Sequence, residues 1–122
     1  MPTISCHALD AVQGTHAAGL GVTLRRCHAG APADVVFAHA TDAGGRLLQS
    51  VEPDTCVDPA DEYELVLAVA DYWAAQPAPP GAANAVRELR LRFRMDAPNA
   101  RYHFPVSVTP SSYSLLLVVQ NP

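Results

Sequence analysis

The chain has 122 residues, of which 49% are hydrophobic and 16% charged, and a net charge of −4 at neutral pH. These values are typical of one globular domain spanning residues 1–122 and exclude an intrinsically disordered chain. The acidic balance and the absence of a recognition motif argue against nucleic-acid binding, and no apolar run reaches the roughly 18 residues of a membrane span.

Short apolar segments separated by turn signals dominate the first half of the sequence. In residues 3–10, Ile4, Cys6 and Ala8 alternate with His7, which predicts a strand with two different faces. Residues 10–19 are expected to form a loop. The strands predicted in this half are residues 3–10, 20–27, 33–41 and 46–51. A glycine turn precedes the last of them.

The second half continues the pattern and adds a helix. Alternation stops after the apolar run that begins at Tyr63, which predicts a brief helix near Asp71 to Ala75. Residues 86–95 place leucines on one face and arginines on the other, as in a strand with one buried and one solvated side. The strands predicted in this half are residues 63–70, 86–95, 102–110 and 113–119. The sequence therefore predicts an all-β sandwich or barrel of seven or eight strands with one short helix.

All eight basic residues are arginines, and five of them lie between Arg87 and Arg101. Because Glu88 and Asp96 lie among them, we interpret this cluster as a solvated strand face rather than an anion-binding patch. The three cysteines, Cys6, Cys27 and Cys56, form no CxxC pair. With no signal-peptide pattern at the N-terminus, they predict reduced thiols in a cytoplasmic protein without a structural zinc site.

Three side chains are candidates for acid–base chemistry. His7 lies on the strand face opposite Cys6, Arg46 directly follows the glycine turn, and His103 lies between two aromatic residues. A histidine pair exchanges protons near neutral pH, and an arginine beside it can bind an anion or polarise a carbonyl. Cys6 and His7 are neighbours in a strand and point to opposite faces, so they cannot form a thiolate–imidazole couple.

A structural role for each histidine is the alternative. The chain also contains His16, His28 and His39, to which the sequence assigns no catalytic role. None of the histidines has the close ligand spacing of a metal site, so we expect no metal.

Three segments carry a family resemblance. They are ISCHALDAVQGTHAAGLGVTLRR at residues 4–26, ATDAGGR at 40–46 and YHFPVSVTPSSYS at 102–114. In this order and spacing they resemble the transthyretin-like family, specifically its 5-hydroxyisourate hydrolases. Their opening strand carries a histidine followed by Leu-Asp, a T-[DN]-x-x-G-R turn follows, and the last motif reads Y-H-[VI]-P-L-L-[VL]-[ST]-P-x-x-Y-[ST].

The resemblance implies a fold, an assembly and an activity. The fold is a two-sheet sandwich of eight strands with a short helix after the fifth, assembled as a homotetramer with its sites between dimers. The activity is ring-opening hydrolysis of a small cyclic ureide or lactam without metal or cofactor. Carried over by motif, His7, Arg46 and His103 occupy three of the family's four site positions.

The C-terminal tail departs from the family. Where the hydrolases end in Tyr-Arg-Gly-Ser, this chain has Leu116, Leu117, Val118 and Val119. We expect these four residues either to bind the substrate or to pack into a subunit interface. An apolar site would favour a repurposed enzyme that catalyses a cyclisation, isomerisation or addition on a less polar substrate in bacterial specialised metabolism. A third alternative is a non-enzymatic ligand binder, as transthyretin is.

Overall fold

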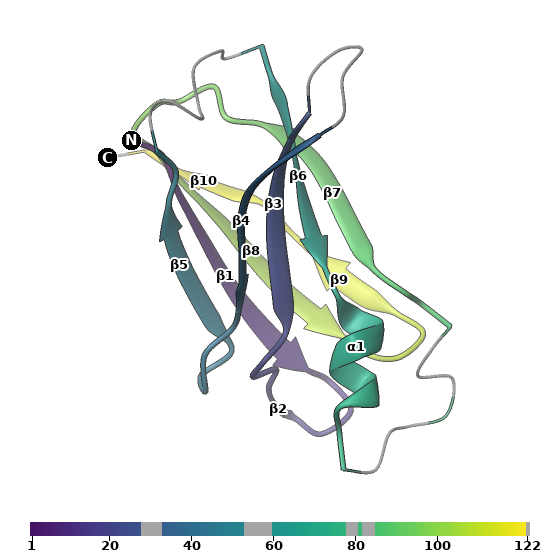
Figure 1. Ribbon diagram of the computed structural model, residues 1–122. Coiled ribbons are helices and arrows are strands. Elements are labelled where there is room, and N and C mark those ends of the chain that lie inside the picture. The colour runs from purple at the N-terminus through teal and green to yellow at the C-terminus, as the bar shows by residue number, and fades with distance from the viewer. Residues whose placement is uncertain (28–32, 53–59, 78–80, 82–84, 122) are drawn as a thin grey trace.

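The computed structural model describes residues 1–27, 33–52, 60–77, 81 and 85–121. These residues form ten strands and one helix, arranged as two facing sheets (Figure 1). The strands are β1 (Thr3–Asp10), β2 (Thr15–His16), β3 (Gly21–Cys27), β4 (Asp34–Ala40), β5 (Arg46–Ser50), β6 (Glu62–Leu67), β7 (Leu89–Arg94), β8 (Arg101–Val108), β9 (Tyr113–Leu115) and β10 (Val118–Gln120), and the helix is α1 (Val69–Ala74). Cys56 and His28 lie outside the described residues, as do residues 53–59 of the loop before β6.

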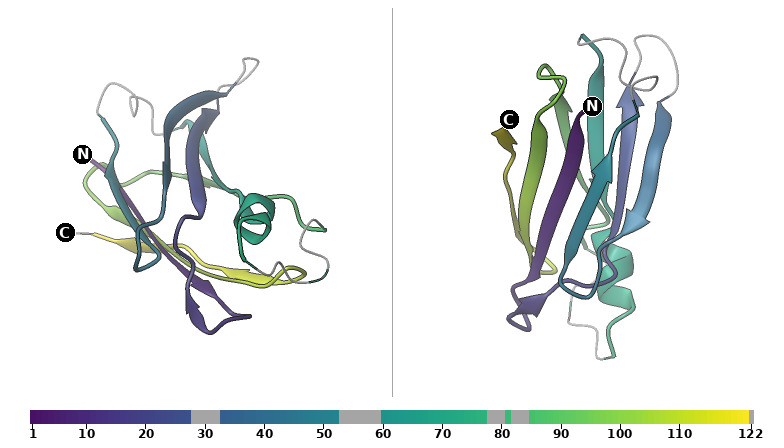
Figure 2. Two further views of the ribbon diagram at one scale, coloured as in Figure 1. Left: turned by 60° about the horizontal axis from the view of Figure 1, so that its bottom comes forward. Right: turned by 90° about the vertical axis from the view of Figure 1, so that its left-hand side faces the viewer.

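The larger sheet is built around β1. This strand pairs with β8 in parallel on one side, and with β5 and β2 antiparallel on the other. The strands β9 and β10 pair with the outer side of β8 and form one edge of the sheet. The second sheet has the order β4-β3-β6-β7, with all neighbours antiparallel. Figure 2 shows the two layers edge-on.

The core lies between the sheets because each strand alternates in polarity. In β1 and β8 the even-numbered residues are buried against the second sheet, among them Ile4, Phe104 and Val106. The odd-numbered residues of both strands therefore face away from the core. The expected two-sheet sandwich is confirmed, and the chain has the all-β architecture that the alternation predicted.

The helix lies where the alternation stops, close to the predicted residues. It follows β6 directly and packs Tyr72 and Trp73 into the core. The Tyr72 hydroxyl donates a 2.7 Å hydrogen bond to the buried carboxylate of Asp10 at the end of β1. Asp10 also accepts bonds from the backbone N–H groups of Val12 and Gln13. Its carboxylate thus fixes the start of the turn after β1. The described residues contain no helix that is long and apolar enough to cross a membrane.

The segment after β1 is more ordered than expected. Instead of a plain loop, residues 11–14 form a turn and β2 pairs back onto β1, with Leu9 opposite His16 and Asp10 opposite Thr15. Gly14 has a φ of 70°, a left-handed conformation that favours glycine. This two-residue strand carries no alternation, which is why the sequence pattern did not reveal it.

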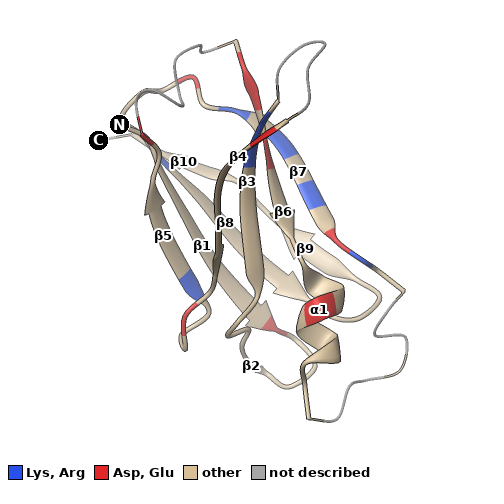
Figure 3. Cartoon of the chain, viewed as in Figure 1, with Lys and Arg blue, Asp and Glu red and all other residues tan. Residues whose placement is uncertain are grey.

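The arginines of β7 form the predicted solvated face. Their side chains pair across the strands with acidic residues of β6, and Figure 3 marks the basic positions of β7 in blue and the acidic ones in red. Arg90 lies 2.6 Å from Glu64, and Arg92 lies 2.7 Å from Glu62. Arg101 is different, because it begins β8 and belongs to the other sheet. The grouping of all five arginines on one face was therefore wrong for Arg101.

The C-terminal residues continue one edge strand in a single register. Val106 pairs with Leu115, and His103 pairs with Val118, so residues 113–120 run antiparallel to β8 without a shift. The ladder is interrupted at Pro105. Its carbonyl accepts a bond from the N–H of Leu116, but proline has no N–H to donate in return. The interruption between β9 and β10 therefore follows from one residue of β8.

Candidate active site

Three of the sequence-predicted site residues, His7, Arg46 and His103, lie on the outer face of the larger sheet. The register places His7 opposite Arg46 and Ser5 opposite His103, so these residues occupy two adjacent rows across β5, β1 and β8. All of them are on the face that points away from the core. Three strands from distant parts of the sequence thus bring the candidates together.

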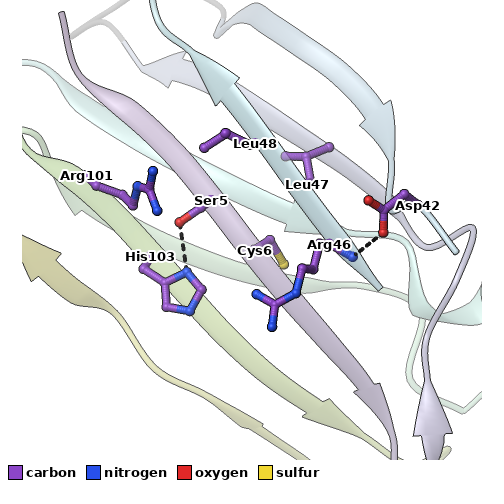
Figure 4. A pocket seen from close by; sticks show the side chains of 8 residues that line it. All are labelled: Ser5, Cys6, Asp42, Arg46, Leu47, Leu48, Arg101 and His103. Carbon is purple, nitrogen blue, oxygen red and sulfur yellow. Dashed lines mark hydrogen bonds between the residues drawn. The ribbon is translucent and has the colours of Figure 1, made fainter. Parts of the chain in front are cut away.

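A pocket of about 290 Å³ lies on this face (Figure 4). It has cationic, polar and apolar walls, with Arg46 and Arg101 entering from different strands. Its lining residues are Ser5, Cys6, Asp42, Arg46, Leu47, Leu48, Arg101 and His103. Two guanidinium groups and an imidazole around one small space favour a ligand with several carbonyl or anionic oxygens.

His103 is held in a defined orientation by Ser5. The Ser5 hydroxyl lies 2.8 Å from Nδ1 of His103, and this contact leaves Nε2 as the nitrogen free for chemistry. Burial lowers the pKa of His103, and the positive charges of Arg46 and Arg101 lower it further. The imidazole is therefore neutral at neutral pH, the form that can act as a base.

Arg46 is positioned by the turn that precedes β5. The Asp42 carboxylate accepts bonds of 2.9 Å from the backbone N–H groups of Gly44 and Arg46. Gly45 has a φ of 70°, and a Cβ at this position would collide with the carbonyl oxygen of Ala8 in β1. Only glycine lets the turn lie this close to β1, and the guanidinium of Arg46 then reaches over Cys6 into the pocket (Figure 4).

His7 lies one row away from the pocket lining. Its ring nitrogen Nε2 is 3.2 Å from Nδ1 of His16, and the two ring centroids are 5.3 Å apart. Partial burial and the charge of Arg46 lower the pKa of His7, with contributions in the same direction from His16 and His103. Asp42 acts in the opposite direction. His7 is thus a second imidazole that is neutral at neutral pH.

Cys6 is a core residue, as the alternation predicted. It is 1% exposed, and burial raises the pKa of its thiol to about 12. A thiol with such a pKa carries almost no thiolate at neutral pH, so it is not a nucleophile. Among the described residues, no three His, Cys, Asp or Glu side chains are grouped closely enough to hold a metal ion.

The four apolar tail residues divide between two faces. Leu116 and Val118 pair with Pro105 and His103, so they lie on the face of the site. Leu117 and Val119 point to the opposite face, where Leu117 packs against the core. The residues that line the pocket include none of these four. Leu116 and Val118, 58% and 42% exposed, flank the site from the sheet edge.

Sequence reasoning missed Ser5, Arg101 and His16. Ser5 is a small polar residue whose partner lies 98 positions away, so no local pattern reveals it. Arg101 was grouped with arginines that belong to the other sheet. His16 had one usable signal: a hairpin after Asp10 with glycine at its turn would place residue 16 diagonally beside His7.

The chain was compared with known proteins. The sequence model of the HIUase/transthyretin family matches residues 4–116. The 5-hydroxyisourate hydrolase of Mesorhizobium japonicum is 34% identical over 115 residues, covering 91% of this chain and 87% of that protein. The 5-hydroxyisourate hydrolase of Halalkalibacterium halodurans is 29% identical over 111 residues, covering 91% and 92%. The crystal structure of transthyretin from Sparus aurata superimposes with a TM-score of 0.79 at 22% identity, covering 97% of both chains.

Proposed function

Because the chain belongs to the HIUase/transthyretin family, we propose that it is a 5-hydroxyisourate hydrolase-like enzyme. It opens the ring of 5-hydroxyisourate or a related small cyclic ureide or lactam by hydrolysis. One observation carries the proposal: His7, Arg46 and His103 lie in adjacent rows of one sheet face, beside a pocket that two of them line. Curated relatives that span most of the chain bear the name of this hydrolase.

In the proposed reaction, His7 removes a proton from the attacking water. Its lowered pKa keeps the imidazole neutral, which is the form that a general base needs. Water then adds to the ring carbonyl, and negative charge develops on the carbonyl oxygen. Arg46 stabilises this oxyanion, because its guanidinium lines the pocket and its backbone is fixed by the Asp42 turn.

His103 completes the ring opening. His103 is neutral at rest; once the oxyanion has formed, it takes up a proton from solvent at Nε2 and donates it to the departing ring nitrogen, while Ser5 accepts from Nδ1 and holds the ring in place. The carbon–nitrogen bond breaks, and the products are a carboxylate and a ureide nitrogen that is not basic. The reaction therefore releases one proton to solvent in each turnover. No metal or cofactor takes part in this scheme.

A second candidate function rests on the tail. Leu116 and Val118 present apolar surface on the site's own face, where a polar tail would give hydrogen bonds. This observation favours a less polar substrate and a non-hydrolytic step, such as a cyclisation, isomerisation or addition, catalysed by the same histidine pair. A non-enzymatic binder is the third candidate. The histidine pair argues against it, because a binder has no need of two neutral imidazoles.

Assembly and location belong to the same proposal. The exposed apolar residues at the sheet edge, Leu116, Val118 and Val119, support self-association, and we propose the homotetramer that the resemblance implies. The thiols of Cys6 and Cys27 are free, which is compatible with a cytoplasmic location.

A direct assay tests the function. Freshly generated 5-hydroxyisourate is mixed with the wild-type protein or with His103→Ala, and its absorbance decay is followed. Rapid decay that is lost in the variant supports the hydrolase. If the wild-type protein does not accelerate decay beyond the spontaneous rate, the hydrolase proposal is wrong, and less polar heterocycles become the substrates to test.

A further inference from the structure

The ring of His16 contacts the proposed base, and the fold creates this contact through a short hairpin. His16 pairs with Leu9, so its side chain lies diagonally beside His7 on the outer face of the sheet. The turn between them is fixed by the Asp10 carboxylate and by the left-handed backbone of Gly14. The contact is therefore a product of an anchored turn and not of two free surface side chains.

The geometry of the two rings constrains their protons. Nε2 of His7 and Nδ1 of His16 are 3.2 Å apart, so one of them carries a hydrogen and the other accepts it. If both nitrogens carried a hydrogen, the two N–H groups would point at each other, and the contact would break. The contact therefore holds at most one bridging hydrogen, so the protonation of either ring depends on the other.

The charged groups around His7 favour proton transfer away from it. Arg46 faces it from β5 and His103 from β8, and both disfavour a positive charge on its ring. Asp42, in the turn before β5, has the opposite influence. When His7 takes a proton from water, its new charge lies beside Arg46. His16 lies farther along the hairpin, in β2 opposite Leu9, and is exposed to solvent.

We propose that His16 is the positioning residue and proton acceptor of His7, passing the proton of the attacking water to solvent. The proposal rests on the proposed function, because it assigns His7 as the base. The proton of water binds Nδ1 of His7, Nε2–H of His7 passes to Nδ1 of His16, and Nε2–H of His16 is released. Each ring then loses the hydrogen on Nδ1 to solvent and takes one up at Nε2, so both histidines return to their starting tautomers with no net gain or loss of protons.

The surroundings of His16 allow the proton to pass to solvent. His16 is exposed, and it lines a second cavity of about 510 Å³ at the end of the sheet, together with Leu9, Gly14, Thr15 and Ser107. This cavity is separate from the pocket that Arg46 and His103 line. The site thus has a substrate side and a solvent side, with the two rings between them.

Two variants test the proposal without relying on turnover. His16→Phe keeps a ring but removes both nitrogens, and His16→Asn keeps a polar atom near the position of Nδ1 but does not titrate. The histidine rings are followed by NMR in isotope-labelled protein over a pH series, and His7→Gln identifies the His7 signal. In the wild type we expect His7 and His16 to show two shared inflections. In both variants His7 titrates in one step. A single-step His7 curve in the wild type overturns the proposal.

Kinetics with an added proton acceptor provide the second readout. In weak buffer, His16→Phe should lower kcat about tenfold with little change in KM, and added imidazole should restore kcat. His39→Phe is the matched control, because His39 is an exposed histidine of the other sheet, and it should behave like the wild type. A loss that imidazole does not restore overturns the relay. If the wild-type protein has no hydrolase activity, the NMR result still decides whether the two rings share a proton.

Discussion

The hydroxyl of Ser5 lies 2.8 Å from Nδ1 of His103, although the two residues are 98 positions apart in the sequence. The parallel pairing of β1 with β8 sets them directly opposite each other. One strand thus orients a histidine of its neighbour, and the antiparallel pairing of β1 with β5 sets His7 opposite Arg46 in the adjacent row. The register of the sheet is what assembles the site.

Removal of the Ser5 hydroxyl should weaken catalysis more than folding. Among the described residues, the Ser5 hydroxyl makes the one side-chain hydrogen bond to the ring of His103. Ser5→Ala deletes this bond, so the imidazole loses its fixed orientation. We expect kcat to fall about tenfold and the free energy of unfolding to fall by about 1 kcal/mol. Ser5→Thr keeps the hydroxyl and serves as the control. Equal kcat values for Ser5→Ala and the wild type would contradict the orienting role.

Burial and, after it, the charge of Arg46 should set the pH range of the site. Because the pKa of both histidines is lowered, they stay neutral below their ordinary pKa of about 6.5. The acid limb of the activity profile should therefore lie below this value. Arg46→Gln removes the nearby charge and should move the titration of both histidines to higher pH, which NMR detects even if activity is lost.

Arg101→Gln provides the contrast. Arg101 contributes to the lowered pKa of His103 but is absent from the causes that act on His7. We expect the titration of His103 to move upward and that of His7 to stay in place. Movement of both by the same amount would show that the arginines act through the general field of the protein rather than through their positions.

Replacement of Gly14 or Gly45 by alanine should lower the free energy of unfolding by different amounts, although the two glycines have the same φ. Gly14 and Gly45 both have a φ of 70°, but a Cβ at Gly45 meets the backbone of β1, whereas Gly14 has open space. Gly14→Ala should cost about 1 kcal/mol through the left-handed conformation alone. Gly45→Ala should cost about 2 kcal/mol more, because β1 or the turn must shift. Urea denaturation of both variants measures the difference, and equal costs would contradict the close approach.

The tail offers a matched pair of valines. Val118 and Val119 are 42% and 47% exposed, but Val118 pairs with His103 and lies on the face of the site. If the tail contributes to substrate binding, Val118→Ser should change KM about three- to tenfold, and Val119→Ser should leave it unchanged. Steady-state kinetics on the confirmed substrate distinguish the two. A change in the oligomeric state of both variants, with KM constant, would assign the tail to an interface instead.

Much of this fold could be predicted from the alternation of apolar and polar residues alone. The buried even-numbered residues of β1, the helix after β6 and the two-sided polarity of β7 all follow from local periodicity. The positions of Arg46 after its turn and of His103 between buried aromatics were also predicted. Local patterns carry this information because each strand has one face in the core and one outside it.

The contacts between strands that are far apart in the sequence could not be predicted from local patterns. His16 lies in a strand of two residues, which is too short to show a period, and Ser5 gives no chemical signal without its partner. Arg101 is close in sequence to the arginines of β7 but belongs to the other sheet. In each case the missing information was the pairing of strands, which depends on the whole chain.

The alternation of β1 also limits how this protein can evolve. His7 and Ser5 share one parity, and Ile4, Cys6 and Ala8 share the other. Insertion or deletion of a single residue within β1 would turn the imidazole into the core and expose the apolar side chains to water. Substrate preference in such a scaffold can change by substitution along the strands, whereas changes in length are tolerated only in the connections between them.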